Sequence, residues 1–472
     1  MTRLLGIDVG TTYLKAVVVS GQGVIQAVRR TRMPLQMPGH GRVELPVDTF
    51  EGLLVSTVQQ VLVSARCDPT EIEAISYASQ ANTFALFDRE VRPLTPFIVW
   101  SDQRIDKRPE SVESWASSPQ LLEKTGVGIV SDQMCVPKAI WLRDRMREVW
   151  KHTRFILTIS DYLAYALTGR VVGDTSTASL LGILDVQTSQ YWEEGLSQIG
   201  LSSGLFAELK QPGVPFGTAT GHLSRAVRLG DQTTVIAGCL DHLAAAIGAG
   251  LGVVANACES TGTVIAFVTL TERFEPEAGA CIGPGVIPAT YARLRFDENG
   301  ARGLDWYRER FSPDLSLDEL TSLAAKAPPG CGGLRVRTIP WKHQGSEAFL
   351  YPVGPGPEPV NHGLHFRALL EGIAVTLRDL VEKERRRAPI EAIVATGGGA
   401  RNDLWLQIKA DMLGSAMLRT NTPEPAAYGA AALAAKWTQN LGASPVDWQS
   451  VDRVFEPHDR RSQMYGWVDE PS

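Results

Sequence analysis

Runs of apolar residues, separated by small or polar ones, mark the expected strands of this chain. Residues 4–19 form one apolar run with a polar centre, a pattern that predicts strand, tight turn and strand. Residues 72–87 predict a second pair of strands around Ser79-Gln80, and residues 234–237 a further strand. Residues 393–400 end in three glycines, which predicts a buried strand followed by a turn.

Apolar residues spaced three and four apart predict helices between these strands. Asp48 and Glu51 have the spacing of a capping box, which predicts a helix that begins there. Pro423 is expected at the first position of an alanine-rich helix that runs to about Trp437. Further helices are expected over residues 137–168, 301–311, 366–381 and 404–412, with a loop at residues 362–365. This alternation of strands and helices predicts an α/β protein.

The length of the chain and a repeated motif predict more than one domain. A chain of 472 residues exceeds what one hydrophobic core supports. Two Gly-Thr turns, Gly10-Thr11-Thr12 and Gly262-Thr263, are each joined to an apolar strand, although they lie far apart in the sequence. This repeated motif predicts two related domains that face one nucleotide.

Composition narrows the class of protein. Hydrophobic residues make up 44% of the chain and charged residues 21%, as in ordinary globular proteins. The net charge of -6 and the lack of a basic stripe argue against a nucleic-acid partner. Six cysteines without C-x-x-C spacing predict buried thiols in a cytoplasmic protein. Neither a signal peptide nor a membrane span is expected, because the weakly polar run at residues 239–258 contains Asp241 and His242.

Asp241 is the candidate general base. It stands among small and apolar residues at the start of an Ala/Gly-rich run, where low dielectric favours a carboxylate that accepts protons. Ser260-Thr261-Gly262-Thr263 follows and precedes an apolar strand over residues 264–268, so hydroxyls and backbone N–H groups are available to a phosphate. Together they point to phosphoryl transfer to a hydroxyl. The alternative is an Asp that caps a core helix, followed by an ordinary glycine turn.

Asp8 precedes the first Gly-Thr turn and is the candidate metal ligand. A carboxylate beside threonine hydroxyls and a glycine is suited to hold Mg²⁺ through water. The alternative is a plain β-hairpin.

Residues 100–104 bring together an aromatic ring, an acid, an amide and a base. Trp100 can cover the C–H face of a polyhydroxylated ligand, while Asp102 bonds its hydroxyls. Alternatively, Arg104 pairs with Asp102 and holds a surface loop in shape. The three glycines of residues 397–399 leave room for a flat ring or a ribose against bare backbone.

In combination these motifs resemble the FGGY family of carbohydrate kinases over nearly the whole chain. Asp8-Val9-Gly10-Thr11-Thr12 and Ser260–Thr263 are similar to the two phosphate motifs of the family, and Gly238–Asp241 to its catalytic segment. Residues 397–402 are similar to the adenosine motif of the family. The motif continues at Trp405, Gln407, Asp411, Glu424 and residues 429–431.

The resemblance implies a fold and a division of the chain. The expected architecture is two ribonuclease-H-like α/β domains of the actin and hexokinase type, with the active site in an interdomain cleft. The domains are expected at residues 1–245, for sugar and phosphate, and 246–438, for ATP, with residues 439–472 as a tail packed on the core. A Walker A loop is absent from the sequence, so other loops are expected to hold ATP.

The resemblance also implies site residues. Asp241 is expected as the catalytic base and Asp8 as the Mg²⁺ ligand. The sugar is expected to contact Gln80, Trp100, Asp102, Arg104 and His242. ATP is expected to contact Thr11, Thr12, Lys15, Thr261, Gly262, Thr263, Gly397, Gly398, Gly399 and Asn402.

The acceptor is expected to be a ketose or polyol, such as xylulose, ribulose or fuculose. Glycerol kinases show Gln-Arg-Glu where this chain has Gln80-Ala81-Asn82, which argues against glycerol. The Asp241-His242-Leu243 sequence, with residues 367–372, is more similar to the xylulokinase and fuculokinase side of the family. Three alternatives stay open: a nucleotide-dependent binding protein of the same fold, a weakly active regulator and a glycerol kinase-like enzyme. A homodimer is a further expectation.

Overall fold

The computed structural model describes residues 2–343, 345–352, 361–436, 448, 450–458 and 465. The chain packs into two compact units. Unit 1 contains Met1–Gly248, Leu270–Arg293 and Thr422–Trp448, and unit 2 contains Ala249–Thr269, Leu294–Asn421 and Gln449–Ser472. The division after residue 245 and the cleft between domains stay predictions. The expected tail at residues 439–472 lies largely outside the described residues.

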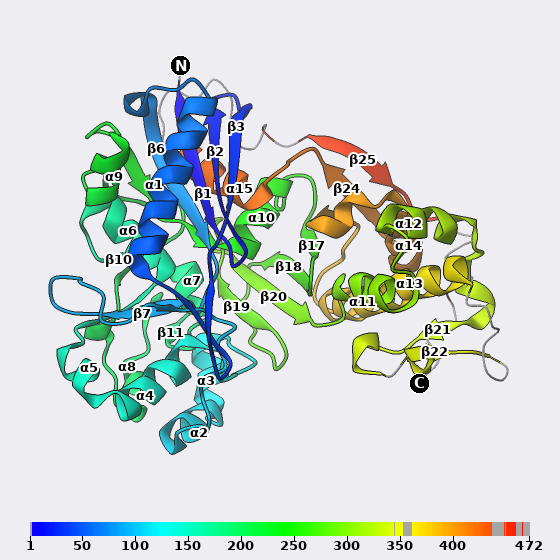
Figure 1. Ribbon diagram of the computed structural model, residues 1–472, viewed down its shortest axis with the longest axis horizontal. Coiled ribbons are helices and arrows are strands. Elements are labelled where there is room, and N and C mark those ends of the chain that lie inside the picture. The colour runs from blue at the N-terminus through cyan, green and yellow to red at the C-terminus, as the bar shows by residue number, and fades with distance from the viewer. Residues whose placement is uncertain are drawn as a thin grey trace. The chain divides into compact units, whose positions relative to one another are not determined.

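A twisted mixed sheet forms the centre of unit 1, in the order β14-β15-β6-β1-β2-β3, with β16 also paired to β6 (Figure 1). β1, β2 and β3 form an antiparallel meander, whereas β6 is parallel to β1, and both β15 and β16 are parallel to β6. The strands are β1 (Arg3–Val9), β2 (Tyr13–Ser20), β3 (Ile25–Arg32), β6 (Ile72–Ser79), β14 (Pro215–Thr218), β15 (Thr234–Ile236) and β16 (Cys239–Leu240).

Alternate residues of this sheet pack against helices on its two faces. Leu5 and Ile7 belong to one core with α1, whereas Leu4 belongs to a second core with the alanines of α15. A methyl group on Gly6 would overlap the carbonyl oxygen of Ala427, so the small residues let α15 lie close to β1. The helices of this region are α1 (Val47–Ser64), α6 (Ile159–Thr168), α7 (Thr175–Ser179), α9 (His222–Val227), α10 (Asp241–Ala249) and α15 (Pro425–Ala435).

A second sheet of unit 1, in the order β4-β5-β8-β7-β9, has its own core around Phe84 and Trp115. Its strands are β4 (Gln36–Gly39), β5 (Arg42–Leu45), β7 (Phe84–Phe87), β8 (Phe97–Ile98) and β9 (Phe155–Thr158). The neighbouring elements are α2 (Glu110–Ala116), α3 (Pro119–Thr125), α4 (Cys135–Arg145), α5 (Arg147–His152), α8 (Glu193–Gln198), β10 (Val172–Asp174), β11 (Leu184–Asp185), β12 (Gln190–Tyr191) and β13 (Glu208–Lys210).

The sheet of unit 2 repeats the sheet of unit 1. Its order is β20-β18-β17-β23-β24-β25; β17 and β18 are antiparallel, and β23 and β24 continue from β17 in parallel. This duplication confirms the expected pair of related α/β folds. The strands of this sheet are β17 (Ala257–Thr261), β18 (Ile265–Thr271), β20 (Tyr291–Asp297), β23 (Ala392–Thr396), β24 (Ala416–Thr420) and β25 (Val451–Phe455), and β21 (Arg335–Val336) pairs with β22 (Phe349–Leu350) in a separate small sheet. β19 (Cys281–Pro284) belongs to a segment of unit 1.

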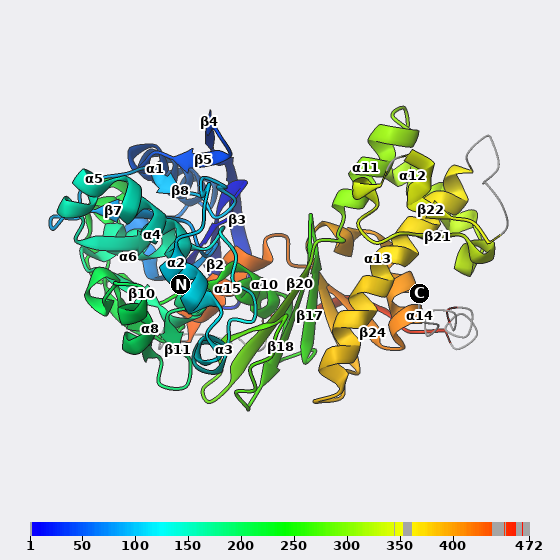
Figure 2. The same ribbon diagram turned by 90° about the horizontal axis from the view of Figure 1, so that it is seen from below.

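The long helix α13 packs against α11, α12 and α14 within unit 2 (Figure 2). The buried side of α13 includes Leu369, Ile373 and Leu377, spaced four apart, as the amphipathic pattern predicts. The helices are α11 (Arg302–Phe311), α12 (Leu317–Lys326), α13 (His362–Arg385) and α14 (Asp403–Leu413), and α14 is preceded by the 3₁₀ turn Gly398–Arg401.

Some expected elements are wrong in detail. No side chain caps α1; Glu51 instead bonds Tyr162 and His222, so a tertiary contact replaces the capping box. Strand β9 interrupts the helix expected over residues 137–168. Residues 362–365 form the first turn of α13 because Asn361 caps it. The alanine-rich helix begins at Pro425 rather than Pro423, and Trp437 lies outside the described residues.

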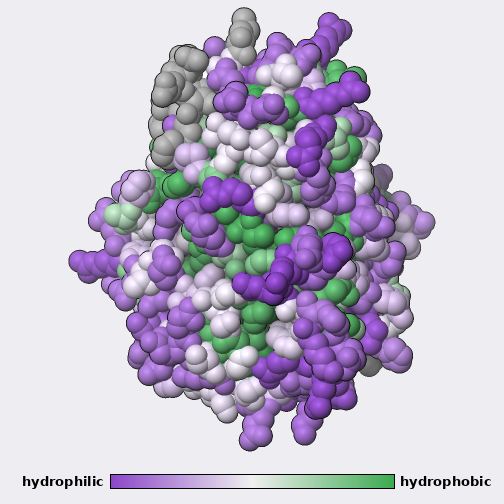
Figure 3. All heavy atoms as spheres, turned by 90° about the vertical axis from the view of Figure 1, so that its left-hand side faces the viewer, coloured by the Kyte–Doolittle hydropathy of each residue, from purple (hydrophilic) through white to green (hydrophobic). Residues whose placement is uncertain are grey.

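The surface of unit 1 mixes charged, polar and apolar side chains. Figure 3 views unit 1 from the left-hand side of Figure 1, and polar side chains surround a group of apolar ones near its middle. All six cysteines are free thiols, five of them buried. Across the described ranges, every helix is too short or too polar to cross a membrane.

Candidate active site

Three neighbouring parallel strands of unit 1 end at the same edge of the sheet. Asp8 lies near the end of β1, Gln80 follows β6, and Asp241 follows β16, which pairs with the end of β6. Because carboxyl ends of parallel strands meet at one edge, the three polar side chains are brought together there. Asp8 and Asp241 are near enough for the charge of Asp241 to raise the pKa of Asp8.

The buried carboxylate of Asp8 belongs to a cluster of charges with Lys15 and Glu424, which are partly buried. Lys15 Nζ lies 3.0 Å from Asp8 Oδ2 and 3.1 Å from Glu424 Oε2. Burial, together with the charges of Asp241 and Glu424, raises the pKa of Asp8 to about 6, although Lys15 opposes the shift. Glu424 is the residue before α15, so a segment distant in sequence completes this cluster.

The Asp8 cluster fits a magnesium ion. The Oδ1 atom of Asp8 is buried and has no hydrogen-bond partner among the described residues. An unused carboxylate oxygen suits Mg²⁺, which binds through one or two carboxylates, with waters and phosphate oxygens as its other ligands. The described ranges contain no group of three or more His, Cys, Asp or Glu arranged to hold a metal alone.

Thr11 connects two of the residues expected to bind sugar. Its hydroxyl donates to Gln80 Oε1 at 2.9 Å and accepts from Trp100 Nε1 at 2.7 Å. The structure therefore brings Thr11, Gln80 and Trp100 together, although Thr11 was expected on the nucleotide side. Thr12, next in the turn, is exposed, and its carbonyl accepts from Met33 N.

Asp102 is bonded entirely within the protein. Its Oδ1 accepts from Arg104 N and Nε, and its Oδ2 accepts from Val43 N and Arg104 Nη2. Arg104 also donates to Glu44. Burial would raise the pKa of Asp102, but the Arg104 and Val43 hydrogen bonds outweigh it and lower the pKa. This geometry matches the alternative in which Asp102 and Arg104 hold the loop in shape.

Lys138 supports the same loop and was missed by sequence reasoning. Its Nζ donates to the carbonyl oxygens of Val99 and Trp100, each at 2.8 Å, and the residue is fully buried. Burial lowers the pKa of Lys138 to about 7. The available signal was a lysine within the apolar run of α4, at a position that faces the core.

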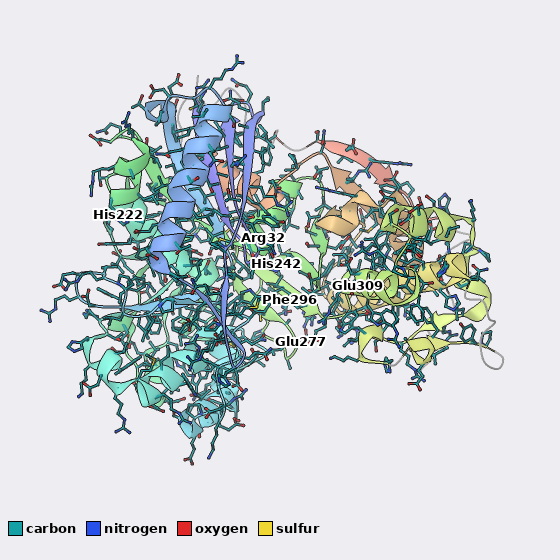
Figure 4. The ribbon with its side chains drawn as sticks, viewed as in Figure 1. Arg32, His222, His242, Glu277, Phe296 and Glu309 are labelled. Carbon is teal, nitrogen blue, oxygen red and sulfur yellow. The ribbon has the colours of Figure 1, made fainter. Side chains whose placement is uncertain are left out.

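Asp241 is the first residue of α10, and its Oδ1 accepts the backbone N–H of His242 at 2.7 Å. This bond is to the adjacent residue, so it differs from the contact by which a side chain caps a helix. Both residues are partly exposed. In Figure 4, His242 lies at the start of α10, well apart from His222 on α9. Ser176 of α7 accepts from the N–H of Leu240, which fixes the backbone just before Asp241.

The two nucleotide motifs of unit 2 are neighbours. β17 pairs with β23, and Ser260 lies opposite Thr396, so the Gly262-Thr263 turn and the loop at residues 397–399 leave the sheet side by side. A methyl group on Gly399 would press on the side chain and carbonyl of Thr261, whereas one on Gly398 would meet open space. Gly397 has a φ of 76°, which favours glycine.

Thr263, Gly397 and Gly398 are exposed, whereas Asn402 is engaged within unit 2. Asn402 Oδ1 accepts from Trp405 N and caps α14, and its Nδ2 donates to Thr321. The loop at residues 397–399 is therefore held at the helix start by Asn402 and leaves exposed glycine backbone.

Thr261 belongs to a fully buried triad that sequence reasoning missed. Lys409 Nζ lies 2.7 Å from Glu259 Oε1 and 2.8 Å from Thr261 Oγ1, which in turn donates to Glu259 Oε2 at 2.6 Å. The hydroxyl of Thr261 is thus bonded inside unit 2, and its contact to ATP stays a prediction. The signal available in the sequence was a lysine within the buried side of α14.

Comparison with known proteins identifies both halves of the chain. The N-terminal domain of the FGGY family of carbohydrate kinases matches residues 3–248, and its C-terminal domain matches residues 216–437. The chain is 27% identical to a xylulose kinase of Lactococcus lactis, over 92% of this chain and 88% of the relative. It is also 27% identical to a glycerol kinase of Thermococcus gammatolerans, over 98% and 96%.

A solved structure supports the fold. The xylulose kinase of Rhodospirillum rubrum superposes with a TM-score of 0.88 at 21% identity, over 99% of this chain and 96% of that one. The match confirms the expected two-domain architecture of the actin and hexokinase type. With both family domains matched across most of its length, the chain belongs to the FGGY family of carbohydrate kinases.

Proposed function

We propose that this chain transfers the γ-phosphoryl group of ATP to a terminal hydroxyl of a ketose or polyol, with Asp241 as the general base. The observation that carries the proposal is the meeting of Asp241, Asp8 and Gln80 at one edge of the unit 1 sheet. At this edge Asp241 can act as the base, Asp8 can hold the metal ion and Gln80 can bond the acceptor, and phosphoryl transfer needs each of these parts.

In the proposed reaction, Asp241 accepts the proton of the attacking hydroxyl. The Oδ1 of Asp241 already accepts the His242 N–H, which orients the carboxylate and leaves Oδ2 for the substrate. The Trp100 ring, held by Thr11, covers the C–H face of the acceptor, and Gln80 orients its hydroxyls.

Asp8 is proposed to hold Mg²⁺ through its Oδ1, directly or through water. When bound, Mg²⁺ supplies positive charge that offsets the charge on the phosphoryl group in transfer. Lys15 keeps Asp8 in place and adds its own charge for the phosphates. Thr12, Thr263 and the exposed backbone at Gly397 and Gly398 are the proposed further contacts to ATP.

A ketopentose or deoxyketose is proposed as the acceptor, with xylulose as the first to test because relatives carry that name. Glycerol is the second candidate, because a relative of equal identity is a glycerol kinase. Against glycerol, Asn82 replaces a charged residue and is engaged inside the unit. Its Oδ1 accepts from Cys135 N and its Nδ2 donates to the Leu180 carbonyl.

The test is ADP release measured with xylulose, ribulose, fuculose and glycerol as acceptors. We expect one ketose to give the highest kcat/KM, and Asp241→Asn to lower kcat for it by about 10²-fold or more. ATP binding should persist in Asp241→Asn, because the nucleotide contacts proposed above do not include Asp241. Near-wild-type kcat in folded Asp241→Asn would refute the assignment of the base.

The same assay separates the enzyme from its rivals. A nucleotide-dependent binding protein would show no ADP release that depends on an acceptor, a weakly active regulator would show little, and a filament former would scatter more light on addition of ATP. The homodimer and the cytoplasmic location remain predictions, which sedimentation and cell fractionation test.

A further inference from the structure

We infer that Glu259, Lys409 and Thr261 form a positioning latch for the nucleotide, which fixes the Gly262-Thr263 turn against the glycine loop of residues 397–399. The inference rests on the proposed nucleotide site. It assigns a role to two charged residues that no sequence motif singled out.

The three side chains form a closed triangle of hydrogen bonds without solvent. Each pair is linked at 2.6 to 2.8 Å, and all three residues are fully buried. Burial lowers the pKa of Lys409, while the nearby Glu259 carboxylate opposes that shift. Hydrogen bonds are directional, so a closed and fully satisfied triangle permits one arrangement of the two segments that carry it.

Those two segments are the ones proposed to hold ATP. Glu259 and Thr261 are in β17, immediately before the Gly262-Thr263 turn, and Lys409 is in α14, which follows the glycine loop. The Thr261 side chain and carbonyl form the wall against which Gly399 packs. A small displacement of Thr261 therefore moves both the turn and the floor of the glycine loop.

Trp405 completes the link between the triad and the loop. Lys409 Nζ lies 4.6 Å from the centre of the Trp405 ring, and the same ring borders Gly399. Trp405 Nε1 donates to the Leu370 carbonyl of α13, which holds the ring in place. The lysine is thus fixed by a cation–π contact as well as by the triad.

A buried ion pair adds little stability, because removing its charges from water opposes folding. Apolar residues of similar volume often stabilise a protein as well or better. What distinguishes the triad from apolar packing is that its hydrogen bonds fix the orientation of the three side chains. This points to a function in placing Thr261, and so to an effect on nucleotide affinity that can be separated from an effect on stability.

The test is calorimetric titration of the full-length chain with ADP alone, at a temperature well below unfolding. Thr261→Val removes the hydroxyl and keeps the shape, and Thr261→Ser keeps the hydroxyl as the matched control. We expect the ADP dissociation constant to rise about tenfold in Thr261→Val, which corresponds to about 1.4 kcal/mol, and to stay within about twofold in Thr261→Ser. Equal affinities in the two variants would overturn the latch.

A triple variant separates positioning from stability. Glu259→Leu, Lys409→Met and Thr261→Val together replace the triad by apolar groups, which should preserve thermal stability while ADP binding weakens. Wild-type affinity in this variant would also overturn the inference; if it does not fold, the Thr261 pair decides. A wild-type chain that binds no ADP would overturn the proposed function, and the latch with it.

Discussion

Asp8→Asn is expected to make the protein more stable while it removes activity. Asparagine has the shape of a neutral aspartic acid, so the variant mimics Asp8 with its proton bound. The folded protein raises the pKa of Asp8 from 3.8 to about 6, which means that folding opposes ionisation of this carboxyl. A difference of about two pKa units corresponds to about 3 kcal/mol at a pH where the carboxyl is ionised in both states.

The sign of the effect follows from proton binding. Between pH 3.8 and about 6, the folded state binds more protons at Asp8 than the unfolded state does, so the wild-type protein loses stability as the pH rises through this window. Below this window, Asp8 is neutral in both states and does not lower the free energy of unfolding. The stability gained by Asp8→Asn should therefore be small near pH 4, about half complete at pH 5 and complete above pH 7.

Urea unfolding, followed by tryptophan fluorescence at pH 5 and pH 8, measures this difference. Asp231→Asn, at an exposed position, is the matched control and should change the free energy of unfolding little at either pH. Kinase activity should fall in Asp8→Asn because the proposed metal ligand is lost. An Asp8→Asn protein that is less stable than the wild type at pH 8, or whose stability gain does not depend on pH, would refute the reasoning.

Three further substitutions probe the loop and the packing of unit 1. Lys138→Met removes both hydrogen bonds that hold the Trp100 loop, so KM for the best sugar should rise at least about fivefold with little change in KM for ATP, in steady-state kinetics. Asp102→Ala should raise the same sugar KM at least about tenfold, equivalent to about 1.4 kcal/mol, because the loop loses its internal ion pair; a change in the ATP KM alone would contradict this. Gly429→Ala places a methyl group onto the Ala244 carbonyl and should destabilise the chain by about 2 kcal/mol or more; an unchanged urea midpoint would contradict the close helix contact.

The central strands of the fold could be predicted because their signal is local. β1, β2, β6 and β23 are mostly apolar runs ended by glycine or polar residues, as buried strands are. The predicted elements are wrong where a residue distant in sequence determines which hydrogen bonds form. Glu51 had a local reason to cap α1, but it bonds Tyr162 and His222, which lie more than 100 residues away.

Residues of the candidate site that lie in local motifs could likewise be predicted, whereas those paired over long sequence distances could not. Asp8, Asp241 and the Gly-Thr turns belong to short motifs, so the sequence predicts them as site residues. Lys409 and Glu259 are 150 residues apart, and neither lies in a motif with an obvious partner. Asp102 illustrates a residue whose two roles have the same sequence signature, and only the geometry distinguishes a ligand contact from an internal ion pair.

The position of α15 in the sequence has a consequence for synthesis of the protein. One face of the β1–β6 sheet is covered by the alanines of α15, which come almost at the end of the chain. A ribosome that has made residues 1–248 must still add more than 170 residues before α15 begins. At about 5–20 residues per second this takes roughly ten to thirty seconds, during which Leu4, Val17 and Val19 lack their cover. We therefore expect the nascent first unit to expose this apolar face, and to be open to chaperone binding, until α15 has been made.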